Sequence, residues 1–253
     1  MESFHRDRPL NFAHRGASKE APANTLPAFL RAAELGADGI ELDAHLSRDG
    51  ELVVIHDFHV DGTTDGHGLV RDKTLAELRE LDAGSWFDPA FAGTQIPTLQ
   101  EVIDAVGRRL LLNIELKARG SRDDGLPAAV VRAIEENNLV NRVVVSSFSR
   151  LAIRRVRQLS PRIPIGYLYY FDPLLGRRPW PHSLARPEAL HPWYKMIDEK
   201  YVRWARGQGY RIHTWTVDDP AVMRRLLDWG VEIIITNRPD VLRQVLAEGH
   251  SSD

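Results

Sequence analysis

Three carboxylates and one lysine stand at spacings that could build a charged site. Glu41 and Asp43 lie two residues apart in the apolar stretch "GIELDAHL", and Glu115 and Lys117 repeat this spacing in "NIELK". Residues two apart in a β-strand point to the same side. Converging carboxylates in apolar surroundings repel each other unless a cation lies between them. Oxygen ligands suit a hard divalent cation, so we predict that Glu41, Asp43 and Glu115 bind one Mg²⁺ or Ca²⁺, with Mn²⁺ as a further option.

A histidine and an arginine end an earlier apolar stretch, "LNFAHR", and a second histidine ends "ELVVIH". Arg15 would face an anion at the metal, while His14 and His56 would stand beside it. Each feature also has a simpler explanation: a carboxylate pair can belong to a solvated strand face, Arg15 can be a surface charge, and Lys117 can simply neutralise Glu115. All of them at strand ends together are hard to explain by solvation.

The elements that would position these residues alternate between strand and helix. Strand-like runs occupy residues 10–14, 39–46, 110–117, 142–147, 163–169, 189–192, 211–217 and 231–236. Helical patterns occupy residues 24–35, 98–106, 126–137, 150–159, 198–206, 220–229 and 239–248. Alternating strands and helices indicate a parallel sheet. Eight units of this kind predict an α/β fold, a (β/α)8 TIM barrel, with a doubly wound open sheet as the alternative.

One run breaks the alternation. The run "ELVVIHD", residues 51–57, follows the second strand after only four residues, Ser47-Arg48-Asp49-Gly50. Four residues are too few for a parallel crossover, and the Asp-Gly step is a hairpin signal. We therefore predict an antiparallel strand, with Leu46 paired to Glu51 and His56 opposite Glu41. Residues 57–96 then form a small insertion, with a helix at 74–81. We expect one barrel domain over residues 1–253.

Composition excludes several classes of protein. The formal net charge is -2, which argues against a nucleic-acid binder and against stable membrane association. The chain has no cysteine, so disulfides and thiolate chemistry are excluded. Neither an apolar signal core nor a long apolar run is visible, and we expect a soluble, cytoplasmic protein. The oligomeric state is left open.

An ordered set of motifs resembles the glycerophosphodiester phosphodiesterase family, in particular its bacterial, soluble branch. The motifs run from about residue 11 to residue 240 and read "HRGAS", "NTLPAF", "GADGIELDAHLSRDGELVVIHD", "TLQEVID", "NIELK", "VVVSSF", "HTWTV" and "GVEIIITNRPD". The resemblance implies a metal-dependent (β/α)8 barrel that cleaves a small-molecule glycerophosphodiester to an alcohol and glycerol 3-phosphate.

The resemblance also implies roles for the site residues. His14 and His56 would be the acid–base pair, and Arg15 and Lys117 would contact the phosphate. Which histidine is the acid stays open, as does whether water or a glycerol hydroxyl attacks. The departures from the family pattern are Ala23 in place of glutamate, Gly62 in place of arginine, and Asn237 in place of aspartate. The first two bear on metal affinity and substrate range.

Two other functions are alternatives to this one. A phospholipase D-like enzyme acting on lysophospholipids would need an apolar channel, for which Trp180, Trp193, Tyr194 and Trp215 are candidates. A non-catalytic phosphoester-binding barrel would not need two histidines. We expect Trp215 to form an apolar wall for the glycerol or its alcohol, and we expect the insertion and residues 171–188 to border the pocket.

Overall fold

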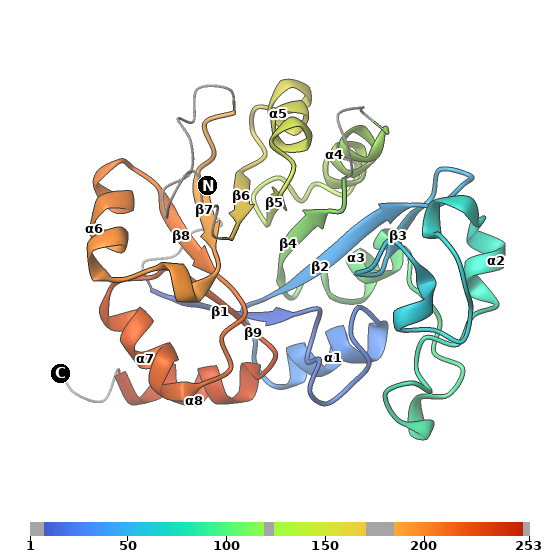
Figure 1. The fold of residues 1–253 in the computed structure, drawn as a ribbon, viewed down its shortest axis with the longest axis horizontal. Helices are drawn as coiled ribbons and strands as arrows, with labels where there is room; N and C mark the ends of the chain where they lie inside the picture. Colours follow the sequence, from blue (N-terminus) through green and yellow to red (C-terminus); the bar gives the residue numbers. More distant parts are fainter. Residues whose placement is uncertain (1–7, 119–123, 171–184, 250–253) are drawn as a thin grey trace.

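The chain forms a closed barrel of parallel strands (Figure 1). The computed structural model describes residues 8–118, 124–170 and 185–249. In these ranges the barrel strands are β1 (Leu10–His14), β2 (Gly39–Leu46), β4 (Leu111–Leu116), β5 (Val143–Ser147), β6 (Ile165–Tyr169), β7 (Ala189–Pro192), β8 (Arg211–Thr214) and β9 (Ile233–Thr236). Because β1 pairs with both β2 and β9, the sheet closes. The predicted (β/α)8 barrel is confirmed, and the open sheet is excluded.

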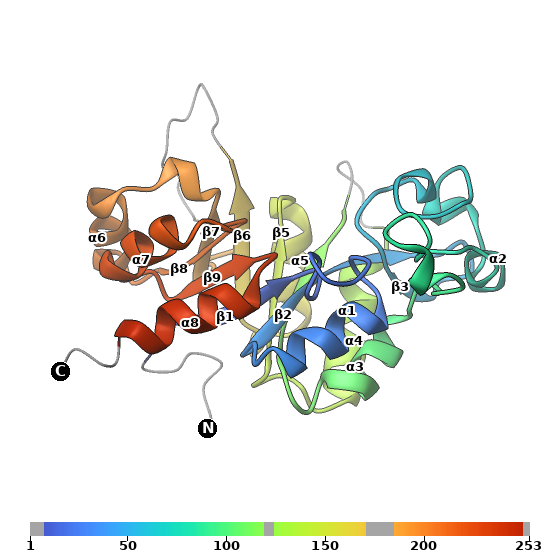
Figure 2. The ribbon, with the colours of Figure 1, turned by 90° about the horizontal axis from the view of Figure 1, so that it is seen from below.

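Helices surround the barrel, as Figure 2 shows for α8, α1 and α3. They are α1 (Leu26–Glu34), α3 (Leu99–Val106), α4 (Leu126–Glu136), α5 (Arg150–Leu159), α6 (Glu199–Gly207), α7 (Pro220–Asp228) and α8 (Pro239–Gly249). Local signals define where they begin: Thr98 and Glu101 form a capping box at α3, and Asp219 caps α7 just before Pro220. Throughout the described ranges, no helix is both long enough and apolar enough to cross a bilayer.

The barrel interior has an apolar layer below a polar layer. Alternate residues of β2, such as Ile40 and Leu42, join the core beneath the helices, so that Glu41 and Asp43 point inward. The apolar layer consists of Leu10, Phe12, Leu111, Val144, Ile233 and Ile235. Phe12 lies so close to Gly39 that a Cβ there would approach its ring to 2.5 Å. The charged groups therefore stand on a packed apolar plug at the carboxyl ends of the strands.

The predicted hairpin is present, but its predicted register is wrong by one residue. β3 (Leu52–Val54) runs antiparallel to β2, and Leu46 pairs with Leu52, not with Glu51. The turn is longer than expected because the Ser47 amide donates to the Glu51 carbonyl at 3.0 Å. His56 therefore lies beyond β3 and is not a strand partner of Glu41. It still reaches the site, because the amide of the preceding residue donates to the Asp43 carbonyl at 3.0 Å.

The insertion extends beyond the end of β2 (Figure 1). It contains the short helices η1 (Val60–Gly62), η2 (Val70–Asp72), α2 (Leu75–Arg79) and η3 (Pro89–Phe91). Its apolar side chains pack with those of β3 in a small cluster of Val53, Ile55, Val60, Val70, Leu78, Ala83 and Ile96. The insertion is thus anchored on the hairpin that delivers His56.

Candidate active site

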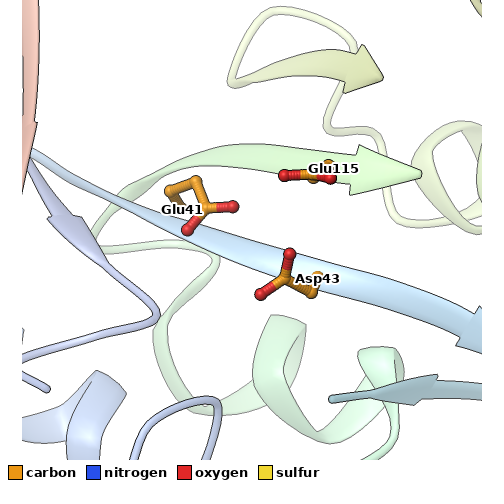
Figure 3. A group of neighbouring side chains, drawn as sticks. All are labelled: Glu41, Asp43 and Glu115. Carbon is orange, nitrogen blue, oxygen red and sulfur yellow. The ribbon is translucent and has the colours of Figure 1, made fainter. Parts of the chain in front are cut away.

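The three predicted metal ligands meet inside the barrel (Figure 3). Strand register brings them together, because Asp43 on β2 pairs with Glu115 on β4 and Glu41 lies two residues earlier. One carboxylate oxygen from each residue lies within 4.8 Å of the other two. All three side chains are buried, with Asp43 only 1% exposed. This compact, all-oxygen donor set fits a hard divalent cation.

Two cations partly neutralise this group. Lys117 Nζ lies 2.8 Å from Glu115 Oε1 and 3.4 Å from Asp43 Oδ1, while Arg15 Nε lies 3.3 Å from Asp43 Oδ2. Burial would raise the pKa of Asp43, but Lys117 and Arg15 lower it below its ordinary value. The pKa of Lys117 is raised because its carboxylate neighbours outweigh the effect of burial.

The other two carboxyl groups have raised pKa values, which favour their neutral forms. Burial and the neighbouring Asp43 and Glu115 raise the pKa of Glu41 well above its ordinary value. Burial and Asp43 raise the pKa of Glu115 to about 7. Asp43 Oδ1 is buried and accepts no hydrogen bond. A bound divalent cation would add positive charge that favours the ionised carboxylates and would give Oδ1 a direct ligand contact, so the residues fit a metal.

His14 ends β1 and is held by a side chain that follows β9. Its Nδ1 lies 2.7 Å from Asn237 Oδ1, and its Nε2 lies 3.9 Å from Glu41 Oε2. The Asn237 amide nitrogen donates to Asp218 Oδ2 at 2.7 Å, so its oxygen is the atom that faces His14. Burial and the nearby Arg15 lower the pKa of His14 to about 4. The imidazole is thus neutral near pH 7, with its proton on Nδ1.

His56 has a different environment. Its Nδ1 lies 2.7 Å from the carboxylate oxygen Oδ1 of Asp57, and its side chain is 35% exposed. Burial lowers its pKa, while Asp43 and Asp57 act in the opposite direction. The ring of His45 supports it from behind, with Nε2 at 3.3 Å from the His56 carbonyl oxygen. The carboxylate partner of His56 carries a full negative charge that favours the imidazolium form, whereas the partner of His14 is a neutral amide.

The loop after β1 has an unusual backbone that aims two side chains at the carboxylates. Arg15 has a φ of 55° and Asn24 a φ of 60°, both in the left-handed region that few residues adopt. Asn24 Nδ2 donates to Asp43 Oδ2 at 2.8 Å, and the Arg15 amide donates to Glu41 Oε2 at 3.2 Å. Strained conformations that point at one cluster are typical of a functional site.

A single cavity joins these groups. It is lined by His14, Arg15, Glu41, His56, Asn113, Glu115, Lys117, Phe148, Leu168, Trp215 and Ile235. Seven of the eight predicted site residues are among them, and Asp43 lies behind Arg15 and Lys117. One part of the lining is charged, and another is apolar and aromatic. Trp215 belongs to the apolar part, as expected, and its Nε1 donates to the His191 carbonyl at 2.8 Å.

Several other residues that were predicted to border the pocket do not line the cavity or lie outside the described residues. No residue of 57–96 lines the cavity among the positions that the structure describes. Trp180 and most of the predicted bordering loop, residues 171–184, lie outside the described residues. Trp193 and Tyr194 do not line the cavity but pack on the core of β6–β9, with Lys195 Nζ 5.1 Å from the Trp193 ring. They pack on the core and do not form part of an apolar channel into the cavity.

Sequence reasoning missed several residues of the site. Asn24 looked like a helix-start signal, but the cap of α1 is Thr25, and Asn24 binds Asp43 instead. Phe148 directly follows β5 at the end of "VVVSSF", where a strand-end position could have marked it. Asp218 and Ser18 reach the site only through Asn237, and no local pattern reveals this connection.

Comparisons with known proteins show which family the chain resembles along its length. Residues 14–241 match the model of the glycerophosphoryl diester phosphodiesterase family. A glycerophosphodiester phosphodiesterase of Caldanaerobacter subterraneus is 44% identical over 96% of this chain and 99% of its own length. One from Bacillus subtilis is 35% identical over 94% and 87% of the two chains. An Oleispira antarctica phosphodiesterase, solved with the product sn-glycerol-3-phosphate, is 30% identical with a TM-score of 0.83, over 95% and 97% of the chains.

Proposed function

This chain belongs to the glycerophosphoryl diester phosphodiesterase family and is a phosphodiesterase, and we propose that it hydrolyses small glycerophosphodiesters with one bound divalent cation. The observation that carries the proposal is that two histidines, a buried carboxylate triad and two cations share one cavity. The expected products are an alcohol and glycerol 3-phosphate. The product bound to the Oleispira relative supports this assignment.

Glu41, Asp43 and Glu115 would hold the cation. When bound, Mg²⁺, Ca²⁺ or Mn²⁺ would neutralise the phosphate and stabilise the charge that grows on its oxygens. Lys117 is 10% exposed and held by two carboxylates, so its ammonium is directed at the cavity with little freedom. Together with Arg15, it would bind and orient the phosphodiester.

The environments of the two histidines favour different roles. His14 is neutral and its Nδ1 is occupied by Asn237, so its Nε2 would accept a proton from the attacking hydroxyl. His56, supported by the Asp57 carboxylate, would donate a proton to the departing alkoxide. The attacking hydroxyl belongs either to water or to the glycerol. Phosphorus NMR distinguishes these cases, because only attack by the glycerol gives a transient cyclic phosphate.

The described part of the cavity favours small alcohols over lysophospholipids. Of the candidates for an apolar channel, Trp215 lines the cavity, whereas Trp193 and Tyr194 are packed elsewhere. A non-catalytic binding role is disfavoured because phosphate binding alone would not require two histidines with separate proton partners.

A substrate panel tests the proposal. Turnover of glycerophosphocholine, lysophosphatidylcholine and bis-p-nitrophenyl phosphate should be compared in EDTA and with each of Mg²⁺, Mn²⁺ and Ca²⁺. We expect metal-dependent release of glycerol 3-phosphate from glycerophosphocholine and much slower turnover of the lysophospholipid. Full activity in EDTA would refute the metal site, and preference for lysophosphatidylcholine would refute the substrate class.

A further inference from the structure

A row of three aromatic rings leads from the cavity to the surface. Phe148 is 5.7 Å from Trp215 and 5.6 Å from Tyr170, measured between ring centroids. The residues directly follow β5, β8 and β6, so they lie at the carboxyl ends of the strands. Trp215 and Phe148 line the cavity, whereas Tyr170 is 65% exposed. The row therefore extends outward from the reacting centre.

The planes of neighbouring rings are steeply inclined to each other. The Phe148 and Trp215 rings lie at 86° to each other, and Phe148 and Tyr170 lie at 57°. The indole N–H of Trp215 is engaged by the His191 carbonyl, which fixes the ring and leaves no hydrogen-bond donor on this wall from Trp215 or Phe148. Phe148 and Tyr170 keep 40% and 65% of their surface exposed. Ring faces at steep angles can contact one rounded group from two sides.

The charges in the cavity are all on the other part of the lining. Arg15 and Lys117 would take the phosphate, and a second cation on the substrate would be repelled by them. The aromatic row is bordered by Leu168 and Ile235, which are apolar. Arg150, two residues after Phe148, has its guanidinium 5.9 Å from the ring of Tyr167. Among the residues that the structure describes on this wall, the ring faces are thus the groups that can attract a cation, through their negative quadrupoles.

This wall does not suit a polyol. The hydroxyls of glycerol need hydrogen-bond partners, and the rings of Trp215 and Phe148 provide none, whereas the charged lining does. The glycerol is therefore better placed on the charged side. The other ester substituent, the departing alcohol, is left to follow the aromatic row toward solvent.

We propose that Trp215, Phe148 and Tyr170 form a subsite for the cationic end of the departing alcohol, and that this subsite selects quaternary ammonium alcohols such as choline. The inference rests on the proposed function and adds its head-group preference. A cation over an aromatic face gains about 2- to 30-fold in binding, depending on how far both are desolvated. A neutral group of the same shape gains only the apolar contact.

The test compares two substrates of the same shape, of which only one carries a positive charge on its alcohol. They are glycerophosphocholine and its neutral isostere, in which 3,3-dimethylbutanol replaces choline. The ratio of their kcat/KM values should be measured for the wild type, Phe148→Leu and Tyr170→Leu. Because both substrates meet the same protein, any loss of folded enzyme cancels in the ratio. Leu151→Ala, at an exposed position in the first turn of α5, is the matched control.

We expect the ratio to favour choline in the wild type and to fall by about 2- to 30-fold in at least one ring variant. The change between proteins reports the subsite, because the greater acidity of choline favours its departure in all of them alike. Tyr170→Phe, which keeps the ring, and Leu151→Ala should retain the wild-type ratio. A ratio unchanged in both Phe148→Leu and Tyr170→Leu would overturn the subsite. Failure of the proposed function itself would look different, because the wild type would then turn over neither substrate.

Discussion

His14 Nδ1 lies 2.7 Å from Asn237 Oδ1, an oxygen that also accepts a hydrogen bond from Ser18 Oγ at 2.9 Å. The amide of Asn237 is oriented by Asp218, which accepts from Nδ2 at 2.7 Å and from the backbone amide at 2.9 Å. This series of hydrogen bonds holds His14 in one tautomer without placing a carboxylate directly against its Nδ1. Residue 237 is thereby a position from which the proton affinity of His14 can be altered.

Changing Asn237 to Asp should alter the pH dependence of activity. A carboxylate beside His14 favours the imidazolium form, so it should raise the His14 pKa from about 4. Because the base must be neutral, the acidic limb of the kcat/KM profile should move to higher pH. Ser18→Ala, which removes a donor to the same oxygen without adding charge, should leave the limb in place. A limb that moves to lower pH in Asn237→Asp would contradict this assignment.

The roles of the two histidines can be separated by the leaving group. His14→Ala and His56→Ala should each lose on the order of 10²–10⁴-fold in rate while retaining the metal. p-Nitrophenolate departs without protonation, so His56→Ala should lose far less with a p-nitrophenyl ester than with glycerophosphocholine. His14→Ala should lose similar activity with both. The reverse pattern would exchange the acid and the base.

The two histidines should also behave as one unit. Because both act on one transition state, the His14→Ala/His56→Ala double variant should lose much less than the product of the two single losses. Single-turnover rates with saturating metal provide the measurement. Full additivity would indicate that the two residues act on separate steps.

Glu115 should make the metal-free protein sensitive to pH. Its pKa is about 7 when folded, above the ordinary value of 4.5, so its neutral form stabilises the fold at low pH. This contribution is lost as the pH rises through the folded pKa. The wild-type Tm in EDTA should therefore fall relative to that of Glu115→Gln as the pH rises from about 4.5 to about 7. Taking the difference between the variants removes the opposite contributions of the buried histidines.

Metal should reverse this effect. A ligand that binds only the folded state raises stability by about 2.7 kcal/mol at 100 times its Kd. Added Mg²⁺, Mn²⁺ or Ca²⁺ should raise the wild-type Tm at pH 8 and have little effect on Glu115→Gln. Differential scanning calorimetry gives both values, and equal shifts in the two proteins would exclude Glu115 as a ligand.

Asn24 should support the metal through Asp43. Its amide donates to Asp43 Oδ2, and its φ of 60° is one that glycine adopts readily. Asn24→Gly therefore removes the hydrogen bond without straining the backbone. We expect metal affinity to weaken by about 10- to 100-fold, as is typical for partners of ligating residues. Isothermal titration calorimetry with Mn²⁺ measures this loss. An unchanged Kd would show that Asn24 does not contribute to metal binding.

Trp215 should contribute to substrate binding more than to the chemical step. Its ring lines the cavity but is apolar and cannot transfer a proton. Its contact with the substrate should therefore act on the ground state and the transition state alike. Trp215→Ala should raise KM more than it lowers kcat. Trp215→Phe should recover much of the KM, and a KM unaffected by Trp215→Ala would remove this residue from the site.

The barrel could be predicted from the sequence because its causes are local and periodic. In β2, alternation places apolar residues on one side and Glu41 and Asp43 on the other, whatever the strand packs against. The strand-to-helix order then requires parallel pairing, and parallel strands gather their carboxyl ends at one face. The convergence of Glu41, Asp43 and Glu115 follows from these two facts.

Local patterns were a weaker guide where a turn or a distant partner decides the result. The register of β3 was missed because a hydrogen bond across residues 47–51 lengthened the turn, and one residue changes every pairing. Asn24 resembled a cap because its contact with Asp43 requires the closed barrel.

The tertiary structure alone assigned proton partners to the histidines. His56 has its partner next to it in the chain, but His14 and Asn237 are separated by 223 residues and meet only because β1 pairs with β9. The same closure brings Phe148, Tyr170 and Trp215 from three strand ends into one row. Sequence determined which chemical groups the barrel mouth would hold, because residue type and strand periodicity are properties of short segments. Barrel closure decided which of them touch, because contact between distant segments depends on how all eight strands pair.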